Sequence, residues 1–355
     1  MKSGYSTIQN SQYSLLHCSP IPLPELTKRD FESDQDTIWC PGCGNHSILN
    51  QIQHILPELG VPKENFVFVS GTGCSGRFPY YIDTYGFHTI HGRAPAIATG
   101  IKIAHPELSV WVITGDGDAL AIGGNHFIHL MRRNLDINVL LFNNRIYGLT
   151  KGQCSPTSER GKITKSTPMG SLEKPINPIG LALAAGATFA ARTIDRDSGH
   201  LQSIIKAAFQ HRGTSFVEIC QNCCTFNSHE FSQYTEEDTK SEHILFLEHG
   251  KPLIFGKHRD KGVRLIGLRP EVVSLTAGIY SIADLMIHDQ FSESPTYAQI
   301  LSRMVGANGF PYPMGIFHCV EHPCYEELLY QQIHDARQQM GSGERSMAEN
   351  ILFAG

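Results

Sequence analysis

The stretch Val110-Trp-Val-Ile-Thr-Gly-Asp-Gly-Asp-Ala-Leu120 joins two kinds of local structure. Its first five residues are apolar or β-branched, which predicts a fully buried strand, and the polar turn after them precedes a helical stretch at about 121–134. Similar short runs recur at 66–69, 139–142 and 216–220, and further helical stretches fall at about 94–105, 177–186 and 197–212. Strands that alternate with helices predict an α/β fold with a doubly wound parallel sheet.

Polar side chains follow two of the predicted strands, at the sheet edge where ligands of such folds bind. Asp116 follows the first strand, and Asn143 and Asn144 follow the second. Mg²⁺ binds oxygen ligands from the protein together with phosphate oxygens. The ligands available here are a carboxylate, an amide oxygen and a backbone carbonyl, best that of Ile146. The glycines allow close approach of a diphosphate, and the helix after Gly117 adds a favourable dipole.

Either polar turn alone would be an ordinary end of a strand. Together, at this spacing, they form the GDG…NN arrangement of thiamine-diphosphate enzymes. The sequence has no G-x-G-x-x-G in a matching context and no G-x-x-x-x-G-K-[ST], so nicotinamide and P-loop nucleotides are not favoured. The sequence therefore predicts a site for thiamine diphosphate and Mg²⁺.

Four cysteines fall at strand ends or helix starts, namely Cys40, Cys43, Cys74 and Cys223. Four converging thiolates make a site for a 4Fe-4S cluster. A zinc site would use Cys40-x-x-Cys43 with Cys220-x-x-Cys223, but these pairs lie ~180 residues apart, against ~15–20 in the usual pattern. A thioredoxin-like dithiol is not favoured because no strand precedes Cys40. Cys220 is expected in the core, Cys154 and Cys224 are not assigned, and a structural role is expected for Cys18, Cys319 and Cys324.

The motif set as a whole resembles the β subunit of 2-oxoacid:ferredoxin oxidoreductases, over roughly residues 35–255. The matching stretches are Trp39–Gly44, Gly73–Ser75, His91–Ala94, Ala98–Lys102, Gly115–Asp118, Asn143–Gln153 and Cys223–Asn227. Within the family, the runs Arg77–Tyr81 and Tyr85–His88 resemble the 2-oxoglutarate branch.

The resemblance implies roles for individual residues. It implies cluster ligands at Cys40, Cys43, Cys74 and Cys223, although the family usually has an apolar residue where Cys224 stands, so either Cys223 or Cys224 could be the fourth ligand. It implies Mg²⁺ at Asp116, Asn144 and Ile146. The implied contacts to thiamine diphosphate, besides the magnesium ligands, are Thr72, Gly73, Cys74, Ser75, His91, Gly117, Asp118, Gly148 and Leu149.

Three side chains have two interpretations each. Arg77 suits the distal carboxylate of a dicarboxylic 2-oxoacid, because a guanidinium binds a carboxylate through two hydrogen bonds, but it could be an interface arginine. His91 could contact the cofactor or close a turn. Asp118 could contact the cofactor or only cap a helix.

The resemblance also implies an activity and partners. A 2-oxoacid, 2-oxoglutarate in this branch, is oxidatively decarboxylated with coenzyme A to an acyl-CoA such as succinyl-CoA, and ferredoxin takes the electrons. Only one thiamine-binding domain fits in this chain, and the family places the other on an α, or fused γ–α, subunit. Pyruvate or another 2-oxoacid is an alternative substrate. A zinc-stabilised, non-redox subunit and a decarboxylase without a cluster are alternatives of other kinds.

Composition limits the remaining possibilities. Charged residues make up 18% of 355 residues, below the ~25% usual for globular chains, which agrees with a surface covered by a partner. The net charge of −5 predicts no nucleic-acid binding, and the absence of a signal-like or membrane-length apolar run predicts a cytoplasmic protein without a membrane span. We expect an arm at 1–38, the cofactor domain at 39–240, and an extension at 241–355 with a hairpin at 251–267 and a helix at 322–340.

Overall fold

The computed structural model describes residues 26–306 and 309–340. Cys18 and most of the predicted arm lie outside the described residues, as does the tail beyond the last helix. No helix in the described part of the chain is long and apolar enough to cross a membrane.

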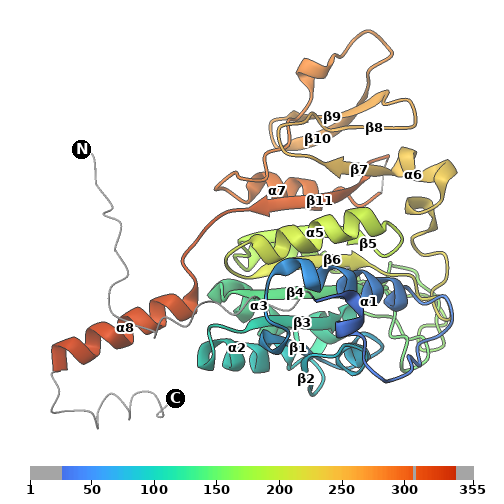
Figure 1. The fold of residues 1–355 in the computed structure, drawn as a ribbon. Coiled ribbons are helices and arrows are strands. Elements are labelled where there is room, and N and C mark those ends of the chain that lie inside the picture. The colour runs from blue at the N-terminus through green and yellow to red at the C-terminus, as the bar shows by residue number, and fades with distance from the viewer. Residues whose placement is uncertain (1–25, 307–308, 341–355) are drawn as a thin grey trace, which may run out of the picture.

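Eight strands form the main sheet in the order β2-β1-β3-β4-β6-β5-β11-β7 (Figure 1). All neighbouring strands are parallel except β11 and β5, which are antiparallel. The predicted doubly wound parallel sheet is thus confirmed, with one antiparallel pair added. The strands are β1 (Phe66–Ser70), β2 (Tyr85–His88), β3 (Ser109–Gly115), β4 (Ile137–Asn143), β5 (Phe189–Ile194), β6 (Ser215–Cys220), β7 (Ile244–Leu247) and β11 (Tyr312–Cys319).

Helices cover both faces of the sheet. On one face α1 (Gly44–Ile55) and α5 (Ser198–Gln210) bury their apolar sides. On the other lie α2 (Ala94–Ala104), α3 (Gly124–Arg133), α4 (Pro178–Ala184) and α7 (Thr296–Ser302). Because both faces are covered, the central strands β1 and β4 are buried along their whole length, which explains their continuous apolar sequence.

The turn after β3 differs from the predicted helix at 121–134. Asp118–Ile122 forms a single π-helical turn, and α3 begins only at Gly124. Such turns are rare and are frequently found at functional sites. Short 3₁₀ helices occupy Lys28–Phe31, Leu56–Leu59, Lys63–Asn65, Ser75–Tyr80, Ser232–Tyr234 and Ile282–Asp284.

The predicted arm and extension are both joined to the central domain. Phe31, in the described end of the arm, is fully buried and its ring packs edge-on against Phe66 at 5.8 Å. After residue 240 come α6 (Glu237–His243), β7 and a separate antiparallel sheet of β8 (Ile254–Phe255), β9 (Lys261–Ile266) and β10 (Arg269–Ser274). The hairpin is confirmed as β8 and β9, and the predicted last helix is α8 (Tyr325–Met340).

Candidate functional site

One cavity of about 440 Å³ lies where β3 and β4 end at their carboxyl edge. Every residue predicted to contact thiamine diphosphate lines it. These are Thr72, Gly73, Cys74, Ser75, His91, Asp116, Gly117, Asp118, Asn144, Ile146, Gly148 and Leu149. The loop after β1 and the residues after β2 line the cavity together with the GDG and NN turns. The parallel sheet therefore brings together four segments that are separate in the sequence.

Asp116 lies at the floor of this cavity and is 2% exposed. Its Oδ2 accepts hydrogen bonds from Ser155 Oγ at 2.5 Å and from Thr157 Oγ1 at 2.6 Å. Burial raises the pKa of the Asp116 carboxyl, and the two hydroxyls oppose that rise. Among the described residues no cation pairs with this carboxylate, and no side chain donates to its Oδ1. A bound dication would supply the missing positive charge, so the donor chemistry fits Mg²⁺.

Asp118 acts within the protein. Its Oδ1 accepts from the backbone amides of Thr72 (3.1 Å) and Gly92 (2.8 Å) and lies 2.6 Å from His91 Nδ1. Its Oδ2 accepts from Thr114 Oγ1 at 2.6 Å. With both oxygens occupied, Asp118 holds the two loops in place around the cavity. A contact of Asp118 to the cofactor stays a prediction.

The second polar turn is fixed from both sides. Asn144 Nδ2 donates to Gln221 Oε1 at 2.9 Å, and Asn144 Oδ1 accepts from the amide of Ile146 at 3.1 Å. The Tyr147 hydroxyl donates to the carbonyl of Gly117 at 3.1 Å. A Cβ atom on Gly117 would lie 2.1 Å from the Tyr147 ring, so only glycine allows these two turns to pack together.

A hydrogen-bonded path runs from the cavity floor into the sheet. Thr157 Oγ1 lies between Asp116 Oδ2 and Asn143 Oδ1, which is 2.9 Å away. Asn143 Nδ2 donates to Glu218 Oε1 at 2.7 Å, and Arg192 Nε donates to Glu218 Oε2 at 2.8 Å. The hydrogen-bonded path from Asp116 therefore ends at the buried ion pair of Glu218 and Arg192.

The four predicted cluster cysteines lie beside this cavity. A Cβ atom on Gly148 would be 3.6 Å from Cys223 Sγ and 3.7 Å from Cys74 Sγ, so these two sulfurs flank one glycine. Burial, together with the negative charges of Cys74, Cys223 and Cys224, raises the pKa of Cys43 to about 12. The pKa of Cys74 is raised by burial, by Cys223 and by Cys40. Thiols that disfavour one another's ionisation in this way fit a set of ligands whose charge iron neutralises.

The neighbouring thiols behave differently. Cys224 Sγ donates to the carbonyl of Pro41 at 3.1 Å, while Cys220 is fully buried beside the Tyr312 hydroxyl. In residues 26–306 and 309–340, no group of three or more His, Cys, Asp or Glu side chains is spaced to hold a single metal ion. The choice of Cys223 over Cys224 and the roles of all four cysteines stay predictions.

Arg77 does not line the cavity. It lies in the 3₁₀ helix at Ser75–Tyr80, where its charge lowers the pKa of Cys74 against the raising effect of burial. Sequence reasoning missed several lining or supporting residues, namely Tyr147, Gln153, Ser155, Thr157, Glu218 and Gln221. Of these, Tyr147 and Gln153 fall inside the Asn143–Gln153 motif, which could have indicated them.

Comparisons with known proteins agree with this geometry. Residues 71–219 match the family model described as the thiamine pyrophosphate enzyme, C-terminal TPP binding domain. The chain is 51% identical over 319 residues to the 2-oxoglutarate oxidoreductase subunit KorB of Mycobacterium tuberculosis, covering 90% of this chain and 85% of that protein. It is 48% identical over 189 residues to the 2-oxoglutarate synthase subunit KorB of Archaeoglobus fulgidus, covering 53% of this chain and 70% of that one.

A solved structure is also similar. The 2-oxoglutarate:ferredoxin oxidoreductase from Magnetococcus marinus, with 2-oxoglutarate, coenzyme A and succinyl-CoA bound, matches 94% of this chain and 98% of its own at a TM-score of 0.73 and 31% identity. The family model indicates a thiamine pyrophosphate enzyme, and the two KorB relatives and the solved structure indicate the particular family. The chain belongs to the β subunits of 2-oxoglutarate:ferredoxin oxidoreductases.

Proposed function

We propose that this chain, assembled with an α or fused γ–α subunit, oxidatively decarboxylates 2-oxoglutarate to succinyl-CoA and passes the electrons through a 4Fe-4S cluster to ferredoxin. The observation that carries the proposal is the position of Gly148. Gly148 lines the cavity predicted for thiamine diphosphate, and it is also flanked by the sulfurs of Cys74 and Cys223. The cofactor cavity and the cysteine set therefore share a wall, as a short electron path requires.

The residues of the cavity fit Mg²⁺ and a diphosphate. Asp116, the side-chain oxygen of Asn144 and the carbonyl of Ile146 would hold the ion. Thiamine diphosphate, when bound, supplies an electron sink for the negative charge left as CO₂ departs. The chain's own part is to orient and shield this chemistry: Asp118 fixes the loops around it, and Ser155 and Thr157 hold Asp116 in place.

Cys40, Cys43, Cys74 and Cys223 would hold the cluster. Cys223 is favoured over Cys224 because its sulfur approaches Cys74, whereas the Cys224 thiol is engaged with Pro41. Arg77 would bind the distal carboxylate of the substrate once the partner subunit completes the site. His91, which lines the cavity and lies against Asp118, would contact the cofactor.

Half of the site would come from the partner. The cavity is open on one side in this chain, and Leu149 in its lining is 49% exposed. A large apolar side chain exposed at a cofactor site is typical of a surface that another subunit covers. The same dependence on a partner agrees with the low content of charged residues. We place the assembled enzyme in the cytoplasm.

The test is an assay of the purified complex under anaerobic conditions. With coenzyme A and either ferredoxin or methyl viologen, 2-oxoglutarate should be oxidised faster than pyruvate and other 2-oxoacids. Broad visible absorption and bound iron should accompany the activity. A complex that carries zinc and no iron, or that prefers another 2-oxoacid, would contradict the cluster or the substrate respectively.

A further inference from the structure

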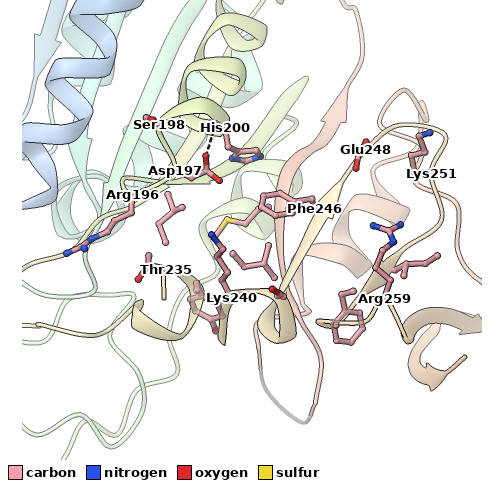
Figure 2. A pocket seen from close by; sticks show the side chains of 18 of the residues that line it. Arg196, Asp197, Ser198, His200, Thr235, Lys240, Phe246, Glu248, Lys251 and Arg259 are labelled. Atoms are coloured by element: carbon pink, nitrogen blue, oxygen red, sulfur yellow. Dashed lines mark hydrogen bonds between the residues drawn. The ribbon is translucent and has the colours of Figure 1, made fainter. Parts of the chain in front are cut away.

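A second and larger cavity, of about 670 Å³, lies beyond the end of β5 (Figure 2). Its wall is made by the start of α5, by α6, by the edge strand β7 and by the loop between β8 and β9. None of its lining residues belongs to the thiamine-diphosphate cavity. We call it the basic groove, defined by Arg196, Lys240, Phe246, Lys251 and Arg259.

The basic groove is lined by four lysine and arginine side chains and by two carboxylates, so positive charge is in excess there. Arg196, Lys240, Lys251 and Arg259 are all exposed, and none of them forms an ion pair with a carboxylate in the described part of the chain. Of the two carboxylates in the lining, Glu248 is exposed, and Asp197 accepts a hydrogen bond from the amide of His200 as the N-cap of α5. The net charge of the whole chain is −5, so the charge of the groove is opposite in sign to that of the chain.

An aromatic side chain stands among these cations. Phe246 projects from the edge strand β7 with 47% of its surface exposed, and its ring packs edge-on against His200 at 5.3 Å. In Figure 2, Arg196 lies to one side of Phe246 and His200, and Lys251 and Arg259 lie to the other. An aromatic anchor with arginine around it is typical of the energetic centre of a protein interface.

The groove is continuous with the surface over the cysteine set. Arg196 also lines a hollow formed with Gly42, Cys43 and His46. Its neighbour Asp195 fixes this junction, since the amide of Asn222 donates to Asp195 Oδ2 at 2.9 Å and Ser47 Oγ donates to the Asp195 carbonyl at 2.5 Å. The loop that carries Cys43 and the strand end that carries Arg196 are therefore held together.

We propose that the basic groove is the docking surface for an acidic electron-carrier protein, which binds with its redox centre facing the Cys40–Cys43 loop. The inference rests on the proposed function, because a carrier can receive electrons at this face only if a redox centre lies at the cysteines. Opposite charge would steer the carrier to this face and orient it, and Phe246 would anchor it.

The arrangement favours a protein surface over a small anion. A phosphate is bound by cations that converge on one point, whereas these four are spread around an open hollow (Figure 2). Each of the four stays exposed, so their charges reach a partner at the surface. Spread charge of this kind matches an extended acidic surface.

The test uses the complete α–β complex with Lys240→Glu and Arg259→Glu, alone and combined. The matched control is Arg269→Glu, an exposed cation at the start of β10 that does not line the groove and forms no ion pair among the described residues. The double variant should raise the KM for an acidic bacterial ferredoxin roughly tenfold at low salt and flatten its dependence on ionic strength. The dissociation constant for the same ferredoxin, measured by biolayer interferometry, should rise in parallel. Reduction of methyl viologen, which needs no docking surface, should stay at the parent rate.

The outcomes separate the two proposals. If the parent complex fails to reduce viologen with 2-oxoglutarate and coenzyme A, the proposed function is wrong, and the dissociation constant still tests the groove. Unchanged ferredoxin binding in the double variant would overturn the docking surface. So would a rise in the KM for coenzyme A alone, which would mark an anionic substrate site, or loss of the α subunit on size exclusion, which would mark a subunit interface.

Discussion

Arg192 and Glu218 face each other on neighbouring strands inside the sheet, with Nε 2.8 Å from Oε2 and both side chains 1% exposed. Arg192 also donates to the carbonyl of Pro313 at 3.2 Å, which joins the pair to β11. Through Asn143 the same Glu218 supports the floor of the cofactor cavity. This ion pair therefore connects the outer strands of the sheet to Asp116.

Breaking this pair should be more harmful than replacing it. Glu218→Ala leaves the Arg192 charge buried without a partner and should cost about 3–5 kcal/mol of stability. The double replacement Arg192→Met with Glu218→Leu leaves no buried charge and should cost clearly less. Thermal denaturation of the assembled complex measures both. Equal losses in the two variants would contradict the account.

Asp116→Ala removes the carboxylate that is proposed to bind Mg²⁺ beside the diphosphate. Thiamine-diphosphate binding should weaken at least roughly tenfold, or about 1.4 kcal/mol. Calorimetry on the complex with saturating Mg²⁺ checks this, and Asp289→Ala, at a half-exposed carboxylate far from the cavity, is the control. Unchanged affinity in the Asp116 variant would rule out the magnesium role.

The cysteine set predicts a pattern of iron loss. Cys74→Ser and Cys223→Ser should each lower the iron content and stop electron transfer to ferredoxin. Cys224→Ser and the buried Cys220→Ala should keep iron near the parent level, because these thiols contact Pro41 and Tyr312. Iron analysis of anaerobically purified complexes distinguishes the cysteines that bind the cluster from those that do not. A full iron content in Cys74→Ser would contradict the proposed ligand set.

His211 should make stability depend on pH. Burial lowers its pKa to about 4, against an ordinary value of 6.5. As the pH falls below 6.5, the unfolded chain gains a proton that the folded chain does not bind until the pH is near 4, so stability is lost across this window. Between pH 7.5 and pH 5 the loss from this one residue should be about 2 kcal/mol.

His211→Gln tests that window because glutamine can keep the contact with Thr188 Oγ1, which lies 2.8 Å from His211 Nε2, without a proton to gain. The denaturation midpoint of the variant complex should fall less than that of the parent when the pH drops from 7.5 to 5. An identical fall in both would show that His211 is protonated in the folded state.

The β subunit alone should not turn over. The proposed function assigns a second thiamine-binding domain to the partner subunit. The purified chain, supplied with thiamine diphosphate and Mg²⁺, should leave 2-oxoglutarate unchanged, and the α subunit should restore viologen reduction that requires coenzyme A. Oxidation by the isolated chain at ordinary enzyme rates of ~10 s⁻¹ would disprove the split site.

Local sequence patterns predicted the central strands and the cavity, because the residues of both lie in short continuous stretches of sequence. Strands β1, β3 and β4 are built on short apolar runs, as β6 is apart from Glu218, and the cavity residues follow these strands. Strand β5 was not predicted because Arg192 interrupts its apolar run, and only Glu218 on the next strand makes that charge acceptable inside the sheet. Strand β11 contains Pro313 and Gly315, which argue against a central strand.

The missed supports of Asp116 have a similar cause. Ser155 and Thr157 reach it from 39 and 41 residues along the chain, and a Ser-Pro-Thr-Ser segment has no periodicity that indicates a partner. Their role depends on tertiary packing. Sequence motifs thus locate the atoms that face a cofactor, whereas the residues that hold those atoms in place need the structure.

The position of β11 between β5 and β7 has a consequence for biosynthesis. Residues 244–247 leave the ribosome well before residues 312–319, the strand with which they pair. Until that later strand is made, the open side of β5 presents unpaired backbone groups, which readily pair with other chains. A nascent chain that already contains every residue of the cofactor cavity is therefore still prone to aggregate, and chaperones should protect it until residue 319 has been translated.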